Sequence, residues 1–271
     1  MLIGKKLLPR FITGFDDVVR VVQESRRSRT GGRMGTATLA IDQHATDEEL
    51  REISAEFETM QPQDVLRWAW SEFGDEVALA TGFGAEGCVL IHMLSQIDRK
   101  ARIFYIDTDL LFPETYALRD QFVARYGVKF ERRSTHLSLV AQSEEFGEKL
   151  WERQPDQCCK LRKVDPLLEM LTDLRAWVTA IRRDQTPARA TAGIVECDQK
   201  FGLIKINPLA RWSSIDVWRY IARNDVPYNH LHNSGYSSIG CTPCTTRVQP
   251  GEDARAGRWR GAEKTECGLH Q

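Results

Sequence analysis

Short apolar runs alternate with amphipathic segments along most of this chain. Five runs have the length and composition of buried strands: 77–80, 101–106, 128–132, 176–181 and 203–206. Apolar residues at helical spacing mark the segments before and between them: 46–57, 63–73, 88–97, 113–126, 163–172 and 213–222. The pairs Thr46 with Glu49 and Ser213 with Asp216 have the spacing of helix caps. Residues 182–201 are expected to be an irregular loop. This alternation predicts an α/β fold with a doubly wound, mostly parallel sheet.

Three of the predicted strands end in polar or glycine-rich segments, at 81–87, 107–109 and 179–184. Ligands of doubly wound sheets bind beyond the carboxyl ends of the strands, so these segments are candidate binding loops. The first, which runs from Thr81 to Gly87, precedes a helix N-terminus, whose free N–H groups favour an anion. It lacks the lysine of a Walker loop and the G-x-G-x-x-G spacing. A phosphate-binding loop and an ordinary strand-to-helix turn both remain open.

Composition narrows the class of protein. The chain has 271 residues and a formal net charge of −1, so it carries no overall basic field that would attract nucleic acid or a membrane surface. No apolar run approaches the ~18 residues of a membrane helix. The seven cysteines, an odd number that includes a C-x-x-C pair, indicate a reducing cytoplasm rather than a secreted disulfide scaffold.

Three parts are expected along the chain. Residues 1–44 are predicted to be a poorly ordered N-terminal extension. The extension is rich in arginine, its acidic residues argue against a transit peptide, and Met34 is an alternative start. Residues 45–248 are predicted to form the α/β domain. Residues 249–271 are charged and contain several glycines, which is typical of a mobile tail.

Five of the cysteines stand in a pattern: the adjacent pair Cys158 and Cys159, the pair Cys241 and Cys244, and Cys267 near the C-terminus. Adjacent cysteines have Cα atoms ~3.8 Å apart, less than the ~4.4–6.8 Å that a disulfide spans. Thiolates favour zinc or iron–sulfur centres. An adjacent pair fits two corners of a cubic cluster better than one tetrahedral zinc ion. On spacing alone, zinc and a disulfide within the C-x-x-C pair stay open.

Several motifs occur in order from about residue 60 to the C-terminus. They are Asp107-Thr108-Asp109-Leu110-Leu111-Phe112-Pro113-Glu114-Thr115-Tyr116, Cys158-Cys159-x-x-Arg162-Lys163, Arg182-Arg183-Asp184-Gln185-Thr186-Pro187, Pro227-Tyr228-Asn229-x-Leu231-His232, Gly240-Cys241-x-x-Cys244, Gly257-Arg258-Trp259 and Glu266-Cys267-Gly268-Leu269-His270. Together they resemble the assimilatory sulfonucleotide reductases, and within that group the iron–sulfur adenylyl-sulfate (APS) reductases. No single motif is decisive, but the ordered set is highly specific.

The resemblance implies an adenine nucleotide α-hydrolase-like fold and a [4Fe-4S] cluster on Cys158, Cys159, Cys241 and Cys244. It also implies a reaction of sulfate assimilation and cysteine biosynthesis. Cys267 would attack the sulfate sulfur of APS, release AMP and retain the sulfur as an S-sulfocysteine. Reduced thioredoxin, or glutaredoxin, would then free sulfite. The cluster is expected to be structural and electrostatic rather than an electron carrier.

The resemblance also implies which residues bind the substrate. They are Thr81, Gly82, Phe83, Gly84, Ile106, Lys163, Arg189, Arg255, Arg258 and His270. Ile106 and Asp107 would border the adenosine. The basic side chains would surround the phosphate and sulfate groups, where charge-assisted bonds stabilise the leaving AMP. His270 is expected to favour the Cys267 thiolate, whereas Glu266 is expected to oppose it. Cys88 and Cys197 match no ligand position and are interpreted as structural.

The chain departs from the family pattern at three positions. Phe83 stands where serine is found, Gly87 where an acidic residue is found, and Asp109 where glycine is common. A preference for the 3′-phosphorylated substrate PAPS, or for both substrates, therefore stays open, although the cluster cysteines favour APS. The oligomeric state is open too, a homo-oligomer included.

Two remoter alternatives come from other classes of protein. One is an ATP pyrophosphatase that thiolates tRNA, but the loop at 81–87 lacks its SGGxDS signature. The other is a non-enzymatic zinc module, which would leave Cys267 and the arginines without a role.

Overall fold

One sheet organises the part of the chain that the computed structural model describes, residues 46–262, 264 and 266–269. Its six strands lie in the order β3-β2-β1-β4-β6-β5. They are β1 Val77–Ala80, β2 Ile103–Ile106, β3 Phe130–Arg133, β4 Ala176–Val178, β5 Val195–Asp198 and β6 Leu203–Ile206. Neighbouring strands are parallel, except that β5 is antiparallel to β6. The predicted doubly wound, mostly parallel sheet is confirmed. The extension expected at residues 1–44 lies outside the described residues.

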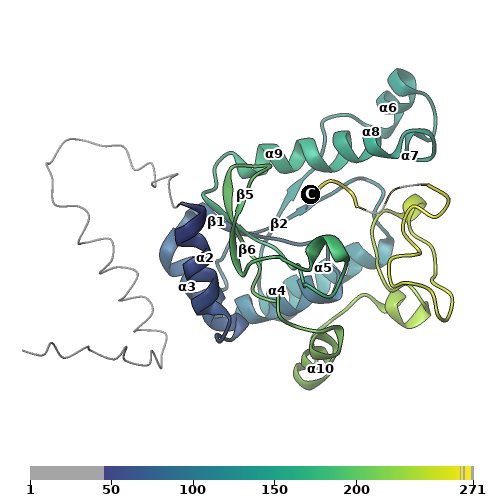
Figure 1. The fold of residues 1–271 in the computed structure, drawn as a ribbon. Coiled ribbons are helices and arrows are strands. Elements are labelled where there is room, and N and C mark those ends of the chain that lie inside the picture. The colour runs from purple at the N-terminus through teal and green to yellow at the C-terminus, as the bar shows by residue number, and fades with distance from the viewer. Residues whose placement is uncertain (1–45, 263, 265, 270–271) are drawn as a thin grey trace, which may run out of the picture. The chain divides into compact units, whose positions relative to one another are not determined.

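Helices cover both faces of this sheet, with α9 on one side and α4 on the other (Figure 1). The described helices are α2 Asp47–Phe57, α3 Pro62–Phe73, α4 Ala85–Ile97, α5 Pro113–Tyr126, α6 Leu139–Phe146, α7 Leu150–Arg153, α8 Pro155–Cys159, α9 Asp165–Leu171 and α10 Ser214–Asn224. Both predicted capping boxes are present, at the start of α2 and of α10. None of these described helices is long and apolar enough to cross a membrane.

The core between α9 and the sheet is built from strand residues that share one face. Ala78, Phe104 and Trp177 come from three neighbouring strands and are fully or almost fully buried. They pack against the apolar face of α9 and the turn that follows it: Leu167, Met170, Leu171 and Leu174. Burial of one such side chain stabilises the fold by roughly 1.5–3 kcal/mol. This cluster therefore fixes α9, and the helical segment before it, against the sheet.

Two parts of the sequence prediction are corrected. Residues 182–201 were expected to be an irregular loop, but Val195–Asp198 form the edge strand β5. An edge strand pairs on one side only. The sequence of β5 is short and half polar, so it does not show the apolar run typical of a buried strand. The helix expected to begin at Cys88 begins at Ala85 and includes Gly87, a residue of low helix propensity. The short helices α6, α7 and α8 had no predicted counterpart.

The order of the strands indicates where a ligand binds. From β1 the chain moves outward to β2 and β3 and then returns to β4 on the other side of β1. The loops after β1 and β4 therefore diverge at the carboxyl ends of neighbouring strands. In doubly wound sheets this switch point is where ligands bind.

Candidate active site

A cavity of about 820 Å³ lies at this switch point. Most of segment 80–87, after β1, lines it, as do residues 180–182, after β4. Ile106, at the end of β2, also contributes. Segment 237–241 and the C-terminal residues Cys267 and Leu269 also line the cavity. The cavity thus brings the candidate binding loops together with the cysteine-rich C-terminal region.

The glycine-rich turn after β1 is held by its own side chains. Thr81 Oγ1 accepts a hydrogen bond of 3.0 Å from the N–H of Phe83. A Cβ atom at Gly87 would lie 2.7 Å from Thr81 Oγ1, so the close approach of helix and turn requires glycine there. Gly84 caps α4 without a side-chain hydrogen bond. The backbone N–H groups in the first turn of α4 are therefore not capped by a side chain. They lie at the cavity wall, where they favour an anion.

Phe83 points away from the cavity. Its backbone has a φ of 56°, in the left-handed region that bulky residues rarely adopt. Its ring is almost fully buried and packs edge-on against the rings of Tyr105 and Phe130, with centroids 5.5 and 5.2 Å away. Such aromatic contacts offset the backbone strain. Only the backbone of Phe83 remains to contribute to the turn.

The two cysteine pairs converge beside the cavity. Cys158, Cys159 and Cys241 are buried and Cys244 is half-buried, all as free thiols. Burial raises the pKa of Cys158 to about 12, and the charges of the other three cysteines raise it further. Burial likewise raises the pKa of Cys244 to about 11, with Cys241 and Cys159 adding to the effect. The four sulfurs are therefore mutual neighbours, although they lie far apart in sequence.

The donor set suits a centre that takes soft ligands. Thiols favour zinc or iron–sulfur centres, and Cys158, Cys159, Cys241 and Cys244 supply four of them. Within the described ranges no three His, Cys, Asp or Glu side chains are arranged to hold one metal ion.

A wide helical turn directs side chains toward the cysteines. Between α8 and α9 the helix continues through a π-helical turn at Lys160–Val164. Such turns insert an extra residue and occur frequently at functional sites. Arg162 and Lys163 in this turn are buried, with 1% and 8% of their surfaces exposed. Each follows a cysteine of the first pair by four residues, so it shares that cysteine's side of the helix.

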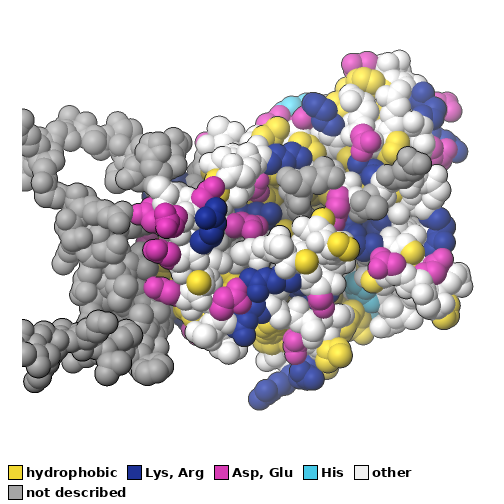
Figure 2. Space-filling model, viewed as in Figure 1, with side chains coloured by type: hydrophobic (Ala, Val, Ile, Leu, Met, Phe, Trp, Pro, Cys, Tyr) yellow, Lys and Arg dark blue, Asp and Glu magenta, His cyan; other side chains and the backbone are white. Residues whose placement is uncertain are grey.

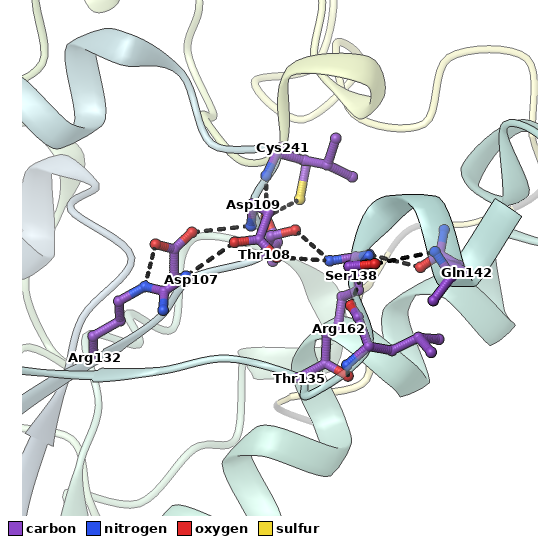
Figure 3. A network of polar contacts seen from close by, with 12 residues as sticks. Asp107, Thr108, Asp109, Arg132, Thr135, Ser138, Gln142, Arg162 and Cys241 are labelled. Carbon is purple, nitrogen blue, oxygen red and sulfur yellow. Dashed lines mark hydrogen bonds and ion pairs between the residues drawn. The ribbon is translucent and has the colours of Figure 1, made fainter.

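Arg162 connects the two cysteine pairs through the loop after β2. Its guanidinium donates to the Thr108 carbonyl at 3.0 Å and to Asp109 Oδ2 at 3.1 Å. Thr108 Oγ1 in turn forms a hydrogen bond of 3.2 Å with Cys241 Sγ. Figure 3 shows Arg162 and Cys241 approaching Thr108 from different sides. Gln142 completes the arginine's surroundings by accepting a hydrogen bond of 2.6 Å.

Asp107 is engaged by protein groups. Its carboxylate accepts hydrogen bonds of 2.7 Å from both Arg132 and Tyr116, and one of 3.0 Å from the Asp109 N–H. Burial alone would raise the pKa of Asp107, but the bonds from Arg132 and Tyr116 lower it below the ordinary value. Asp107 was expected to border the adenosine. Its side chain is committed to holding the loop, and Ile106 is the neighbouring side chain that lines the cavity.

Lys163 lies between the cysteine pairs and Cys267. Burial opposes its charge, but the neighbouring Cys241, Cys267 and Cys159 thiolates raise its pKa above the ordinary value. The ammonium group also lies over the ring of Trp259, 5.8 Å from the centroid. Lys163 therefore lies beside the cysteines and also lines the cavity.

Three arginines bring positive charge to the tail side of the cavity. Arg189 and Arg255 each donate to Glu266 Oε2, at 3.0 and 3.1 Å. Arg258 stacks over Trp259 with 4.4 Å to the ring centroid. Burial lowers the pKa of the Arg189 guanidinium, against which the Glu266 charge raises it. Both Arg189 Nε and Arg258 Nε are buried without a hydrogen-bond partner among the described residues.

A close approach by glycine makes room for Arg258. A Cβ atom at Gly240 would lie 2.3 Å from a terminal nitrogen of the Arg258 guanidinium. Any side chain at position 240 would therefore displace the arginine, or the chain just before Cys241. The close contact with Arg258 therefore explains why position 240, in the Gly240-Cys241 motif, is glycine.

Cys267 lies in the cavity wall and is half-buried. Its charge acts on Lys163 and on Arg258, so it lies close to both. The tail is held on either side of it. Lys264 forms an ion pair with Asp156, and the Gly268 carbonyl accepts a hydrogen bond of 2.5 Å from Lys200.

The structure brings together most of the residues that sequence reasoning proposed. Lining the cavity are Thr81, Gly82, Gly84, Ile106, Lys163, Arg189, Arg255, Arg258, Cys241 and Cys267. His270 lies outside the described residues. Sequence reasoning treated Glu266 only as a charge opposed to Cys267, but its carboxylate is bound by two arginines. Its place in the motif next to Cys267 was the only signal that could have drawn attention to it.

Acidic and basic side chains are interspersed on the face drawn in Figure 2. This distribution agrees with the net charge of −1. The face shown thus lacks the uniform basic surface by which proteins bind RNA backbones. The tRNA-directed alternative gains no support from it.

Comparison with known proteins identifies the family. Residues 76–247 match the phosphoadenosine phosphosulfate reductase domain. The chain is 48% identical to the adenosine 5'-phosphosulfate reductase of Salinibacter ruber, covering 82% of this chain and 88% of that one. It is 47% identical to adenosine 5'-phosphosulfate reductase 1 of Bacillus subtilis, covering 76% and 89%.

Solved structures agree with this assignment. A phosphoadenylyl-sulfate reductase from Candida auris, solved as a phosphate complex, superposes with a TM-score of 0.66 and 30% identity over 79% of this chain and all of that one. An FMN adenylyltransferase from Candida glabrata shares the fold alone, with a TM-score of 0.50 and 15% identity over 86% of this chain and 75% of that one. The chain belongs to the phosphoadenosine phosphosulfate reductase domain family.

Proposed function

We propose that this protein reduces adenylyl sulfate to sulfite and AMP in sulfate assimilation. The relatives named adenosine 5'-phosphosulfate reductase support this substrate, because they match most of the chain at 44–48% identity. The observation that carries the proposal is the cavity in which Lys163, Arg189 and Arg258 surround Cys267. A tethered thiol among buried cations suits attack on an anionic sulfuryl group.

Arg189 and Arg258 are suited to an anion with several oxygens. Arg189 Nε and Arg258 Nε are N–H groups without a partner among the described residues, and an unpaired buried donor costs about 1–3 kcal/mol. A phosphate or sulfate oxygen would satisfy each of them through a charge-assisted bond. Lys163 adds a charged donor on the side of the cysteine pairs. These groups would stabilise the charge that develops on the departing AMP.

The reaction balances as three displacements at sulfur. The Cys267 thiolate attacks the sulfate sulfur, a sulfur–sulfur bond forms, and the bond from sulfur to the bridging oxygen breaks. AMP leaves with that electron pair. A thiolate of a dithiol donor such as thioredoxin then attacks Cys267 Sγ and displaces sulfite, which carries away the electron pair. The donor's second thiol releases Cys267, so the dithiol is oxidised by two electrons and the sulfur is reduced by two.

We propose that Cys158, Cys159, Cys241 and Cys244 hold a [4Fe-4S] cluster. The support is that an adjacent cysteine pair and a C-x-x-C pair, far apart in sequence, lie close enough for their charges to act on one another. When bound, the cluster supplies a rigid link between the two cysteine pairs and a charge beside Lys163. Brown protein with absorbance near 400 nm (roughly, as for thiolate-bound iron–sulfur centres) and matching iron and sulfide contents are expected. Colourless protein that contains zinc would contradict this.

Residues 249–271 are proposed to act as the catalytic tail. Cys267 must reach the substrate in the first step and the donor dithiol in the second, which requires the tail to move. Because the donor is a reduced dithiol, we place the reaction in the cytoplasm.

The decisive experiment measures sulfite release with reduced thioredoxin and either APS or PAPS. The holoprotein is expected to release sulfite from APS at the higher kcat/KM; the reverse order would assign it to PAPS. Cys267→Ser should lower sulfite formation by at least about 10³-fold, because the nucleophile is removed. Cys197→Ser, on the edge strand β5, is the matched control and should keep full activity. Sulfite formation by the Cys267→Ser variant would refute the proposed mechanism.

A further inference from the structure

The C-terminal tail places an acidic side chain in the proposed anion site. Glu266 is buried, with 8% of its surface exposed. Its Oε2 accepts hydrogen bonds from Arg189 and Arg255 at 3.0 and 3.1 Å. Both arginines line the cavity, and both belong to the set proposed to bind the substrate's anionic groups.

Glu266 satisfies Arg189 incompletely. Its Oε1 is buried without a hydrogen-bond partner among the described residues, although Arg189 Nη2 lies 2.9 Å away. Arg189 Nε is likewise buried and unpaired within the described part of the chain. A planar carboxylate offers two oxygens in one plane, whereas a phosphate or sulfate offers oxygens in tetrahedral directions. A tetrahedral anion can therefore replace Glu266 with a gain in hydrogen bonds.

The tail also places an apolar side chain in the cavity wall, at the same core cluster as Ala80 and Ile106. Leu269 packs against the core cluster of Phe104 and Trp177, as do Ala80 and Ile106. Leu269, Ala80 and Ile106 all line the cavity. The segment 266–269 thus presents an anionic group and an apolar group to the same cavity that is proposed to take the phosphate and base of a nucleotide.

We infer that Glu266 is a positioning residue that competes with the nucleotide's anionic group for Arg189 and Arg255. Without nucleotide, its carboxylate holds the tail in the cavity and keeps Cys267 half-buried. When the nucleotide binds, its phosphate takes over the arginines and frees the tail at Glu266. Cys267 then gains the freedom to reach the sulfur and, later, the donor dithiol. This inference rests on the proposed function, because it needs a nucleotide in the cavity.

The test compares AMP binding to the full-length holoprotein and to Glu266→Gln by calorimetry. Loss of the competing charge should tighten AMP binding about tenfold, which corresponds to about 1.4 kcal/mol. A merely structural role would loosen AMP binding instead. Glu266→Asp keeps the charge, so its affinity for AMP should stay within about threefold of that of the unmodified protein. Glu76→Gln is the matched control, because Glu76 pairs with Arg175 outside both the cavity and the tail.

A second measurement needs no variant. Iodoacetamide labelling of Cys267, followed by peptide mass spectrometry, should become several-fold faster when AMP is added. In Glu266→Gln the labelling should already be fast without AMP. Equal labelling rates with and without AMP, or equal AMP affinity in the protein and in Glu266→Gln, would overturn the inference. If neither protein bound AMP, the proposed function itself would fail, and that outcome is distinguishable.

Discussion

Two kinds of arginine surround the cysteines, and they differ in how fully they are paired. Arg162, near the loop after β2, is buried and donates to two carbonyls, a carboxylate and an amide. Arg189 and Arg258, which line the cavity near the C-terminal tail, are half-buried, yet each keeps a buried Nε without a partner among the described residues. The pKa of both is lowered by burial. The first arginine is saturated by the protein, whereas the other two retain binding capacity.

This difference separates a structural arginine from a ligand-binding one. A desolvated, incompletely paired cation is unfavourable for folding and is expected where a ligand supplies the missing acceptor. A saturated cation has no such capacity and instead ties segments together. Arg162 ties the loop at 107–109 to the helix that carries the first cysteine pair. The two groups should therefore respond differently to mutation.

The largest effect is expected for Arg162→Met. Removing one partner of a buried charged network leaves the others desolvated and should lower the free energy of unfolding by about 3 kcal/mol. Because Arg162 connects the two cysteine pairs, bound iron should be lost as well. Urea unfolding and iron per chain measure both effects. Arg125→Met, which removes an exposed ion pair with Asp225, should leave both unchanged.

Arg258→Gln should act on activity rather than stability. Removing a positioned cationic donor from the site should lower kcat/KM for APS by about 10²-fold. The urea midpoint should fall little, because the lost guanidinium was incompletely paired. Steady-state kinetics and unfolding on the same samples check this. A large loss of stability with unchanged kcat/KM would place Arg258 with the structural group.

Asp107→Asn should lower the free energy of unfolding by about 1–2 kcal/mol, because the charged acceptor of Arg132 and Tyr116 is lost. The folded pKa of Asp107 is lowered, so its contribution is fully present above the unfolded pKa of about 3.9. It is lost only as the pH falls through the lower, folded pKa. The stability difference from the unmodified protein should therefore be the same at pH 8 and pH 5. A difference that shrinks between those values would contradict the assignment.

The smallest effect is expected for Glu252→Gln. Hydrogen bonds from Arg260 lower the pKa of Glu252 to about 2. The pair is exposed, however, so solvent and salt screen it. The thermal midpoint should stay within about 2 °C of the unmodified protein. A larger shift would show that pairing without burial stabilises this fold more than the comparison implies.

Much of the fold could be predicted from local pattern. The run Val77–Ala80 is apolar on both faces because helices cover both sides of the sheet, and it forms β1 as predicted. Edge strand β5 escaped prediction because its pairing with β6 supplies what its composition lacks. The π-helical turn at Lys160–Val164 has no sequence periodicity of its own. Its consequence, the burial of Arg162, appears only in the folded chain.

The sequence by itself determined the α/β class, the candidate loops and the two cysteine pairs, because helical and strand periods and residue chemistry are local properties. Only the tertiary structure decided which charges meet. In the folded chain Glu266 pairs with Arg189 and Arg255, and the Phe83 ring packs in the core. Glu266 and Arg189 are separated by 77 positions, so their contact depends on how the tail crosses the switch point of the sheet. Spacing along the chain carries no information about such a crossing.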